Sequence, residues 1–316
     1  MLALDDVFDT GLATVLDAFE TANELAEMSG LALPRFEVKI VGVRKTVQTS
    51  QGLIVPVAAV PMRIIPDWVV VPAIGFKMPG PLQAALARSD VSDAGKTLRS
   101  WAQRGAATAA ACIGTFVLAA SGLLDNQDST TTWWLAPLFR QRYPKVRLDE
   151  SRMIVKSGKF VTAGAALSHM DLALWIIRQK SPRLAALTAK YLVVDSRPSQ
   201  SAYILVDHLA HSDELVDRFE RWARGRLTHG FSLDAAAAAA GSSKRTLARR
   251  MQAVLGKSPL SYFQELRVER AVHLLKTTEH NVEEIAARVG YADGVTLRTL
   301  LRRRLGHGIK EIRSSL

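Results

Sequence analysis

Hydrophobic positions follow two different patterns along the chain. In the first 180 residues, short apolar or β-branched runs alternate with stretches in which apolar residues recur every three or four positions. The short runs predict strands at residues 36–43, 68–72, 106–111, 153–156 and 160–162, and the longer stretches predict helices at 11–28 and 168–179. This alternation is typical of an α/β fold in which a mainly parallel sheet is flanked by helices.

The pattern becomes purely helical beyond Asp213, and it repeats. In each copy a short helix with one apolar face ends at a glycine, Gly241 in the first and Gly290 in the second. A second helix follows each glycine, with an apolar face formed by Leu247, Met251 and Leu255 in one copy and by Leu297, Leu301 and Leu305 in the other. Two helices joined by a tight turn, found twice, predict an all-α domain with two helix-turn-helix units.

The outward faces of the two second helices carry residue types that contact DNA. Arginine and glutamine can make two hydrogen bonds to a base edge in the major groove, and basic residues at the flanks can bind phosphates. The predicted DNA-binding residues are Lys244, Arg245, Thr246, Arg249, Arg250, Gln252, Thr296, Arg298, Thr299, Arg302 and Arg303. For any one of these arginines, the alternative of a merely solvated helix face stays open.

One helix is predicted to join the two units. Ser258 and Pro259 are typical of an N-cap and a first helical position, and the helix should run to about Lys276. Its apolar stripe is expected to include Leu260, Phe263, Leu266, Ala271 and Leu274. Such a brace would fix the separation of the two recognition helices, which on one face of DNA is about 34 Å.

Charge supports a polyanionic partner for the C-terminal part. Of the net charge of +11, the residues from Asp217 onward contribute +9, with 19 Lys and Arg against 10 Asp and Glu. A basic domain of this kind is the expected footprint of nucleic acid. We therefore place one domain at residues 1–195 and a DNA-binding domain at residues 213–316, with a boundary region near 195–212.

The C-terminal segment, from about 213 to 313, resembles the AraC/XylS regulators. The resemblance rests on residues 245–251 (RTLARRM), 257–259 (KSP), 266–271 (LRVERA), 284–291 (EIAARVGY) and 302–306 (RRRLG). The chain departs from the family after Gly306, where His307, Gly308 and Ile309 replace a usual Ser-Pro. The resemblance implies double-stranded DNA as a partner, with two adjacent major-groove segments per protomer, a homodimer, and contact with RNA polymerase if the protein is an activator.

Cys112, the single cysteine, occupies a distinctive place in the N-terminal domain. Residues 109–118 read as a strand, a sharp turn and a helix, so the thiol would lie at a helix N-terminus, where the dipole favours a thiolate. This geometry is a nucleophile elbow. A single cysteine also excludes an intramolecular disulfide framework and is consistent with a reducing, cytoplasmic compartment.

This region, across roughly residues 1–180, resembles the ThiJ/PfpI, class I glutamine amidotransferase-like domain. Residues 109–118, 119–125 (AASGLLD), 130–133 (TTTW), 143–144 (YP) and 171–174 (DLAL) carry the resemblance. Enzymatic members have a histidine after the cysteine, where this chain has Ile113, and Thr132 occupies a second position where many related regulators have histidine. Asp9 is the nearest candidate for the family's acidic partner, and His169 reads as a surface or capping histidine.

Cysteine catalysis needs a base, and none is visible beside Cys112 in the sequence. We therefore expect no catalytic residues and a ligand crevice at the ends of the central strands. The residues predicted to line it are Asp9, Ala73, Gly75, Cys112, Ile113, Thr132 and Trp133. Trp133 and Trp134 could cage a cation, although one core tryptophan and one at a contact surface is the commoner arrangement.

The sequence thus predicts a cytoplasmic, dimeric transcriptional regulator controlled by a small effector, for which the family resemblance implies a nitrogenous metabolite. No metal or cofactor is expected. Two alternatives remain: the N-terminal domain is an active cysteine-dependent hydrolase or amidase, or it only dimerises. No secretory signal is visible, and the uncharged stretch 105–124 could be either a membrane span or a buried strand running into a buried helix.

Overall fold

The computed structural model describes residues 1–61, 63–195, 197, 199–200, 204, 209, 211, 213–305 and 308–314. The chain divides into two compact units, Met1–Gln200, called here the α/β unit, and Ser201–Leu316, called the helical unit. The expected boundary region at 195–212 lies largely outside the described residues, as do Gly306 and His307, where the sequence departs from the AraC/XylS pattern. Each unit is described separately below.

The main sheet of the α/β unit has four strands in the order β10-β11-β7-β6. Three of them are parallel, β6 (Trp68–Val71), β7 (Ala107–Ala111) and β11 (Phe160–Ala163), and β10 (Ile154–Ser157) runs antiparallel to β11. A smaller parallel sheet contains β1 (Leu2–Ala3), β2 (Val41–Gly42) and β5 (Ala58–Ala59). Two-stranded pairs are formed by β3 (Thr46–Gln48) with β4 (Ile54–Pro56) and by β8 (Asp128–Ser129) with β9 (Arg147–Leu148). The prediction of a mainly parallel sheet is confirmed.

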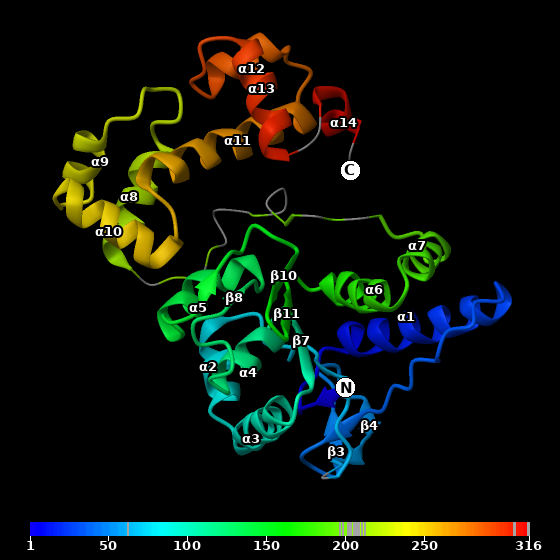
Figure 1. The fold of residues 1–316 in the computed structure, drawn as a ribbon. Coiled ribbons are helices and arrows are strands. Elements are labelled where there is room, and N and C mark those ends of the chain that lie inside the picture. The colour runs from blue at the N-terminus through cyan, green and yellow to red at the C-terminus, as the bar shows by residue number, and fades with distance from the viewer. Residues whose placement is uncertain are drawn as a thin grey trace. The chain divides into compact units, whose positions relative to one another are not determined.

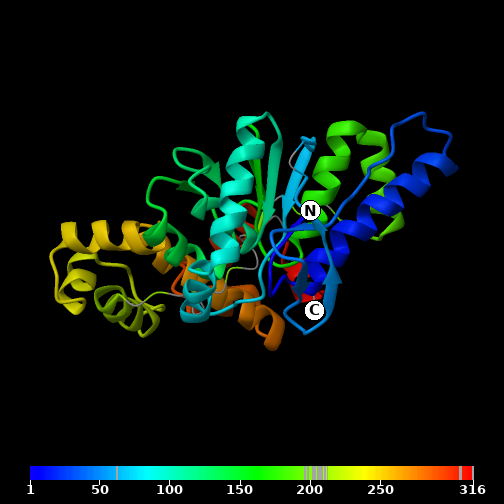
Figure 2. The same ribbon diagram turned by 90° about the horizontal axis from the view of Figure 1, so that it is seen from below.

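Helices cover both faces of the main sheet (Figures 1 and 2). On one face lie α1 (Asp9–Met28), α6 (Ser168–Lys180) and α7 (Pro182–Tyr191), and on the other α2 (Pro79–Leu86), α3 (Ser89–Gln103) and α4 (Gly114–Ala120). The 3-10 helix η1 (Trp133–Leu135) leads into α5 (Ala136–Arg142). Because both faces are covered, β7 is buried along almost its whole length and consists of small residues that let helices approach closely.

Two sequence expectations in this unit are decided by the structure. The strand predicted at 36–43 is wrong over most of its length, since only Val41–Gly42 forms β2. The backbone of Phe36 is instead satisfied by Asn23 on α1, whose carboxamide accepts from the Phe36 N–H at 2.8 Å and donates to its carbonyl at 3.0 Å. The uncharged stretch 105–124 contains β7 and α4, and across the described part of the chain every helix is too short or too polar to span a bilayer.

The helical unit contains seven helices among its described residues: α8 (Glu214–Arg224), α9 (Leu233–Ala239), α10 (Lys244–Leu255), α11 (Pro259–Thr277), α12 (Val282–Arg288), α13 (Gly294–Leu305) and α14 (Ile309–Ser314). Asp213 caps α8 by accepting from the N–H groups of Leu215 and Val216. The expected cap of α11 is present, with Ser258 at the N-cap and Pro259 in the first turn. Gly241 and Gly290 adopt the left-handed conformation at the two turns, with φ of +65° and +81°.

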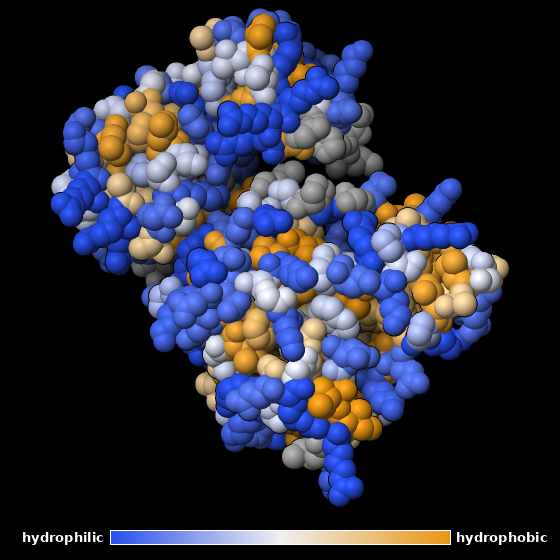
Figure 3. Space-filling model, viewed as in Figure 1, coloured by the Kyte–Doolittle hydropathy of each residue, from blue (hydrophilic) through white to orange (hydrophobic). Residues whose placement is uncertain are grey.

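Helix α11 contributes to two separate hydrophobic cores. Its first half packs with α8, α9 and α10 around Phe219, Met251 and Phe263, and its second half packs with α12, α13 and α14 around Leu275 and Ile285. Leu260 is an exception to the predicted stripe, because at the start of α11 it is 46% exposed. On the surface visible in Figure 3, hydrophilic residues cover much of this unit.

Candidate functional site

Helix α10 presents a basic face opposite its buried one. Leu247, Met251 and Leu255 are buried, as predicted, whereas Arg245, Arg249 and Gln252 are exposed. Ser243 caps the helix by accepting a hydrogen bond from the N–H of Thr246 at 3.1 Å, and the Thr246 hydroxyl is thereby held at the helix start. The geometry leaves these arginine side chains available to a partner in the major groove.

The two flanking cations of α10 are engaged within the helical unit. Lys244 Nζ lies 2.8 Å from Asp234 Oδ1 on α9, and Arg250 Nε contacts Asp213 Oδ2 at the N-cap of α8. Asp213 is almost fully buried, whereas both basic side chains remain more than half exposed. These two residues were predicted to bind phosphates, and each would have to share or exchange its carboxylate partner to do so.

Helix α13 repeats the arrangement with a different set of side chains. Leu297 and Leu301 are buried, and Thr296, Arg298, Thr299, Arg302 and Arg303 are exposed. Asp293 accepts from the Thr296 N–H at 2.6 Å and stabilises the first turn, while Arg298 lies 3.6 Å from Glu283 on α12. Val295, 64% exposed beside them, was not among the predicted contacts, although an apolar side chain there can meet a thymine methyl group.

Arg267 on α11 holds the two helix-turn-helix units together, and sequence reasoning did not single it out. Its guanidinium donates to the carbonyls of Leu227 and His229 in the loop before α9 and stacks on the rings of Phe263 and Tyr291. A Cβ at Gly290 would collide with that guanidinium, so the second turn requires glycine for space as well as for its positive φ. A lone arginine inside an apolar helix face was the available signal.

A second link runs through Glu265, two residues earlier on α11. Its carboxylate lies 2.5 Å from Lys257 Nζ, just after α10, and 3.5 Å from Arg304, at the end of α13. Together with Arg267, this pair of contacts ties both recognition helices to one rigid helix.

One group in the helical unit offers ligand atoms to a cation. His211 faces Asp217 at 3.5 Å and Glu220 at 3.3 Å, and the carboxylate of Glu220 also accepts from the Tyr262 hydroxyl at 2.6 Å. Burial lowers the pKa of His211, but Glu220 and Asp217 outweigh this effect and hold that pKa above its ordinary value. A protonated His211 thus satisfies both carboxylates as an ion-pair cluster.

In the α/β unit, Cys112 lies at the strand-to-helix turn that the sequence predicts. Its φ of +54° is unusual for a residue with a side chain and matches the strained turn of a nucleophile elbow. The Cys112 N–H donates to Ala163 O at the end of β11, and α4 begins two residues later at Gly114. Gly114 is required because a Cβ there would collide with the carbonyls of Val71, the last residue of β6, and of Pro72, which follows it.

The expectation that this position favours a thiolate is wrong. Cys112 is 3% exposed, and burial raises the pKa of its thiol to about 12, although a backbone contact from Ile113 and the Thr132 hydroxyl oppose the shift. Helix α4 spans only seven residues, so its dipole does not compensate for the loss of solvation. At neutral pH, Cys112 is therefore a buried, protonated thiol.

His169 is fully buried, which corrects the expectation of a surface histidine. Its Nε2 accepts from the Ala73 N–H at 3.1 Å, and its Nδ1 donates to the Ala166 carbonyl at 2.6 Å. Gly11 on α1 gives the ring its space, since a Cβ there would lie 2.6 Å from Nε2. Burial lowers the pKa of His169 to about 4, so the ring is neutral and both nitrogens are already used.

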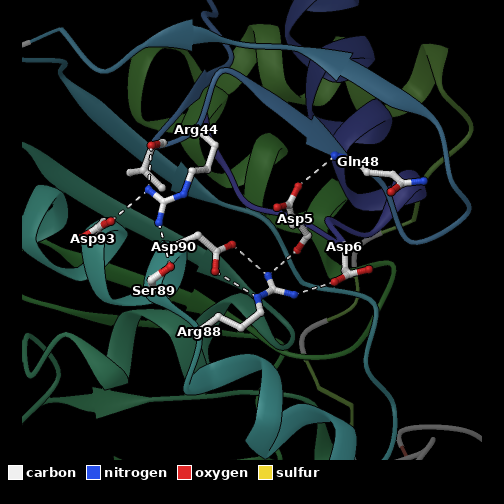
Figure 4. A network of polar contacts seen from close by, with 9 residues as sticks. Asp5, Asp6, Arg44, Gln48, Arg88, Ser89, Asp90 and Asp93 are labelled. Carbon is white, nitrogen blue, oxygen red and sulfur yellow. Dashed lines mark hydrogen bonds and ion pairs between the residues drawn. The ribbon is translucent and has the colours of Figure 1, made fainter.

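The other predicted crevice residues fall into two groups. Asp9, Ala73 and Gly75 belong to one: Asp9 accepts from Ser50 Oγ at 2.8 Å, and Gly75 N–H donates to Asp6 O at 2.7 Å. Arg88 contacts the side chains of Asp6 and Asp90 and the backbone carbonyl of Asp5 (Figure 4), and it thereby holds the segment at 5–6 in place. Through its Oδ2, Asp9 thus orders the loop at 49–51, whereas its buried Oδ1 has no hydrogen-bond partner among the described residues.

Ile113 and Thr132 form the second group, around Cys112. Thr131 Oγ1 donates to Cys112 O at 2.8 Å, which holds the segment 130–132 against the elbow. Trp133 and Trp134 follow, edge to face with centroids 5.5 Å apart, and both are partly buried. A cavity of about 420 Å³ lies elsewhere, between α3, α4 and α5, and its lining includes Val91, Gly95, Arg99 and Tyr143.

Comparisons with known proteins agree with both units. Residues 1–179 match the model of the DJ-1/PfpI family, and residues 236–315 match that of a helix-turn-helix domain. The HTH-type transcriptional regulator GbdR of Pseudomonas aeruginosa is 26% identical over 296 residues, covering 92% of this chain and 77% of GbdR. The HTH-type transcriptional activator RhaS of Enterobacter sp. is 32% identical over 109 residues, 34% of this chain and 39% of RhaS.

A solved structure shares the fold of the N-terminal part. The crystal structure of an AraC family transcriptional regulator from Pseudomonas putida aligns with a TM-score of 0.50 and 18% identity, covering 60% of this chain and 96% of that one. The two family matches together span most of the sequence and correspond to the two units of the structure. The chain therefore belongs to the DJ-1/PfpI family and is a DNA-binding transcriptional regulator of the AraC type.

Proposed function

We propose that α10 and α13 read two adjacent major-groove segments of an operator, and that the α/β unit binds a small nitrogenous metabolite that controls this binding. The observation that carries the first half is the pair of exposed faces, Arg249 with Gln252 and Arg302 with Arg303, each set on a helix fixed to α11. Exposed arginines on a rigid helix can reach base edges without losing internal ion pairs.

Arg249→Ala and Arg302→Ala test this assignment. Each substitution is expected to weaken binding to the specific operator by about 1–3 kcal/mol while changing binding to random DNA much less. Arg178→Ala, which removes an exposed positive charge from α6, is the matched control and should leave the ratio of the two affinities unchanged. Gel-shift titrations on both duplexes decide it, and equal losses on both for Arg249→Ala would refute base reading.

Lys244→Ala separates phosphate binding from base reading. Loss of its charge should weaken all duplexes alike and reduce the salt dependence of binding by about one unit of slope. Because Lys244 lies 2.8 Å from Asp234, Asp234→Asn should have the opposite effect, freeing the lysine for a phosphate.

Ligand binding in the α/β unit is supported by its architecture. The Cys112 elbow and the Ala73–Gly75 loop both follow parallel strands at their carboxyl ends, where open α/β sheets bind ligands. A metabolite that binds there should raise the melting temperature of the full chain and change its operator affinity by the same linkage. A metabolite library that shifts neither quantity would contradict the proposal.

Cys112 is proposed to contribute to binding without acting as a nucleophile. Its protonated thiol and the full engagement of His169 provide neither a thiolate nor a free base. Turnover of amide or ester substrates that is lost in Cys112→Ser would instead establish a hydrolase. We further expect a cytoplasmic homodimer, and contact with RNA polymerase if the protein is a transcriptional activator, as RhaS is by its name.

A further inference from the structure

Gln200, the last residue of the α/β unit, has an unexpected environment. It is a polar side chain close to the helical unit in sequence, yet it is fully buried. The segment that carries it is held on the surface of the α/β unit: Arg197 pairs with Asp171 on α6, Ser199 Oγ donates to Ser151 O at 2.7 Å, and the Gln200 N–H donates to the same carbonyl at 2.9 Å.

The carboxamide lies against Gly164, directly after β11, and against the segment at 130–131. Its Nε2 donates to Thr131 O at 2.9 Å, Thr130 Oγ1 at 3.2 Å and Arg152 O at 3.3 Å. Thr131 is the residue whose hydroxyl is bonded to Cys112 O, so this pocket and the elbow share one wall. Thr130 and Thr131 are themselves completely buried.

Gly164, directly after β11, makes room for the carboxamide. A Cβ at this position would lie 2.5 Å from Gln200 Nε2 and 2.7 Å from its Cδ and Oε1. The flat amide therefore rests against backbone in a space that any larger residue would fill. Gln200 Oε1, by contrast, is buried without a hydrogen-bond partner among the described residues.

These contacts satisfy only one half of the Gln200 carboxamide. Three oxygen acceptors converge on one N–H₂ group, while the oxygen of the same side chain is left unsatisfied, which costs free energy in a buried place. A ligand that keeps the N–H₂ group and satisfies its own acceptor would bind better than Gln200 does.

We propose that this pocket is the effector site of the α/β unit, that it recognises a neutral primary amide or urea group, and that Gln200 occupies it in the absence of effector. The inference rests on the proposed function for the role of the effector. An ammonium or guanidinium is a poorer match, because the three described contacts are carbonyl and hydroxyl oxygens and none of them carries a charge to pair with a buried cation. A carboxylate is excluded by repulsion from the same oxygens.

Effector binding would release Gln200, the last residue of the α/β unit, from its contacts with Thr130, Thr131 and Arg152. Competition between a tethered side chain and a free ligand also sets the sensitivity of the site, because the effector must displace a group held at high local concentration. Gln200→Ala therefore should open the site and leave room for the fragment it removed.

The experiment uses the full chain and three fragments of nearly the same shape: neutral acetamide, anionic acetate and cationic acetamidinium. Binding is followed by NMR through the backbone amides of Gly164 and Thr131. Gln200→Ala should bind acetamide at least about tenfold more tightly than the wild type, and more tightly than it binds acetate or acetamidinium. The matched control is Gln179→Ala, which removes an exposed glutamine of α6 and should behave as the wild type.

A second variant guards against an effect on folding alone. Thr130→Val in the Gln200→Ala background removes one acceptor at nearly constant shape and should weaken acetamide binding severalfold. The proposed amide site would be refuted if Gln200→Ala and Gln179→Ala bound acetamide with equal affinity, or if Gln200→Ala bound acetate as tightly as it binds acetamide.

Operator affinity, measured on the same proteins, separates this inference from the proposed function. Intact operator binding without an acetamide site would overturn the inference alone. An acetamide site in a chain that binds no operator would overturn the proposed function and leave the site standing.

Discussion

Candidate functional side chains of the helical unit are exposed and come from single helices, whereas those of the α/β unit are buried and come from distant segments. Arg249 and Gln252 lie one turn apart on α10, and both face solvent. His169 instead meets Ala73 across 96 residues, and Gln200 meets Thr131 across 69. An exposed surface can act through charge and shape alone, but a buried site must first lose an internal partner or open.

The comparison predicts that the buried groups of the α/β unit react slowly with reagents in solution. Cys112 is the clearest case: burial raises the pKa of its thiol from the ordinary value of 9.0 to about 12, which lowers the thiolate population at neutral pH about 1,000-fold. Alkylation of the native chain by iodoacetamide, followed by mass spectrometry, should be slower by at least that factor than in the unfolded chain. Alkylation at the rate of a free thiol would show that the elbow is open and activated.

Arg267 is an exception in the helical unit, because its charged side chain is buried, whereas the candidate DNA-binding residues are exposed. Arg267→Ala should reduce the free energy of unfolding by about 3 kcal/mol, since it leaves the carbonyls of Leu227 and His229 unpaired and strips two aromatic rings of their cation. Urea unfolding of the full chain measures this loss in the free energy of unfolding. Arg270→Ala, at an exposed position of the same helix, is the control and should change stability by less than about 0.5 kcal/mol. Equal losses in both variants would contradict the bracing role.

His169 gives the α/β unit a pH dependence of known sign. Its pKa is lowered from 6.5 to about 4, so its contribution to stability is present above pH 6.5 and is lost as the pH falls through 4. At pH 5 the loss amounts to about 2 kcal/mol. Melting curves of the wild type and His169→Asn at pH 7 and pH 5 isolate this contribution. The wild type should lose more stability than the variant, and parallel losses would mean that the ring is not held neutral.

The difference between the units also explains what the sequence could predict. In the helical unit, the helices, caps, left-handed glycines and exposed faces follow from spacing within about ten residues, and most of them are confirmed. Leu260 shows the limit, because an apolar residue at the first turn of a helix need not face the core. The role of Arg267 depends on a loop 40 residues away and could not be read from local spacing.

In the α/β unit, the sheet, the flanking helices and the Cys112 turn were predictable, but the chemistry of the turn was not. The position suggested a thiolate, and the burial of Cys112 by residues from β11 and the 130–132 segment reversed that expectation. Likewise, the sequence placed Ile113 and Thr132 near the elbow, whereas Gln200 belonged to the stretch at 195–212 that the sequence marked only as a boundary region. Non-local packing decided each of these outcomes.

The central claim is that two recognition helices, held by α11, engage DNA together. Methylation interference on an operator bound by the full chain tests it most directly, because guanine N7 methylation blocks major-groove contacts. The account predicts two clusters of interfering guanines per protomer, centred about 10 base pairs apart, with Arg302→Ala weakening contacts in only one of them. A single contiguous cluster, unaffected by Arg302→Ala, would contradict it.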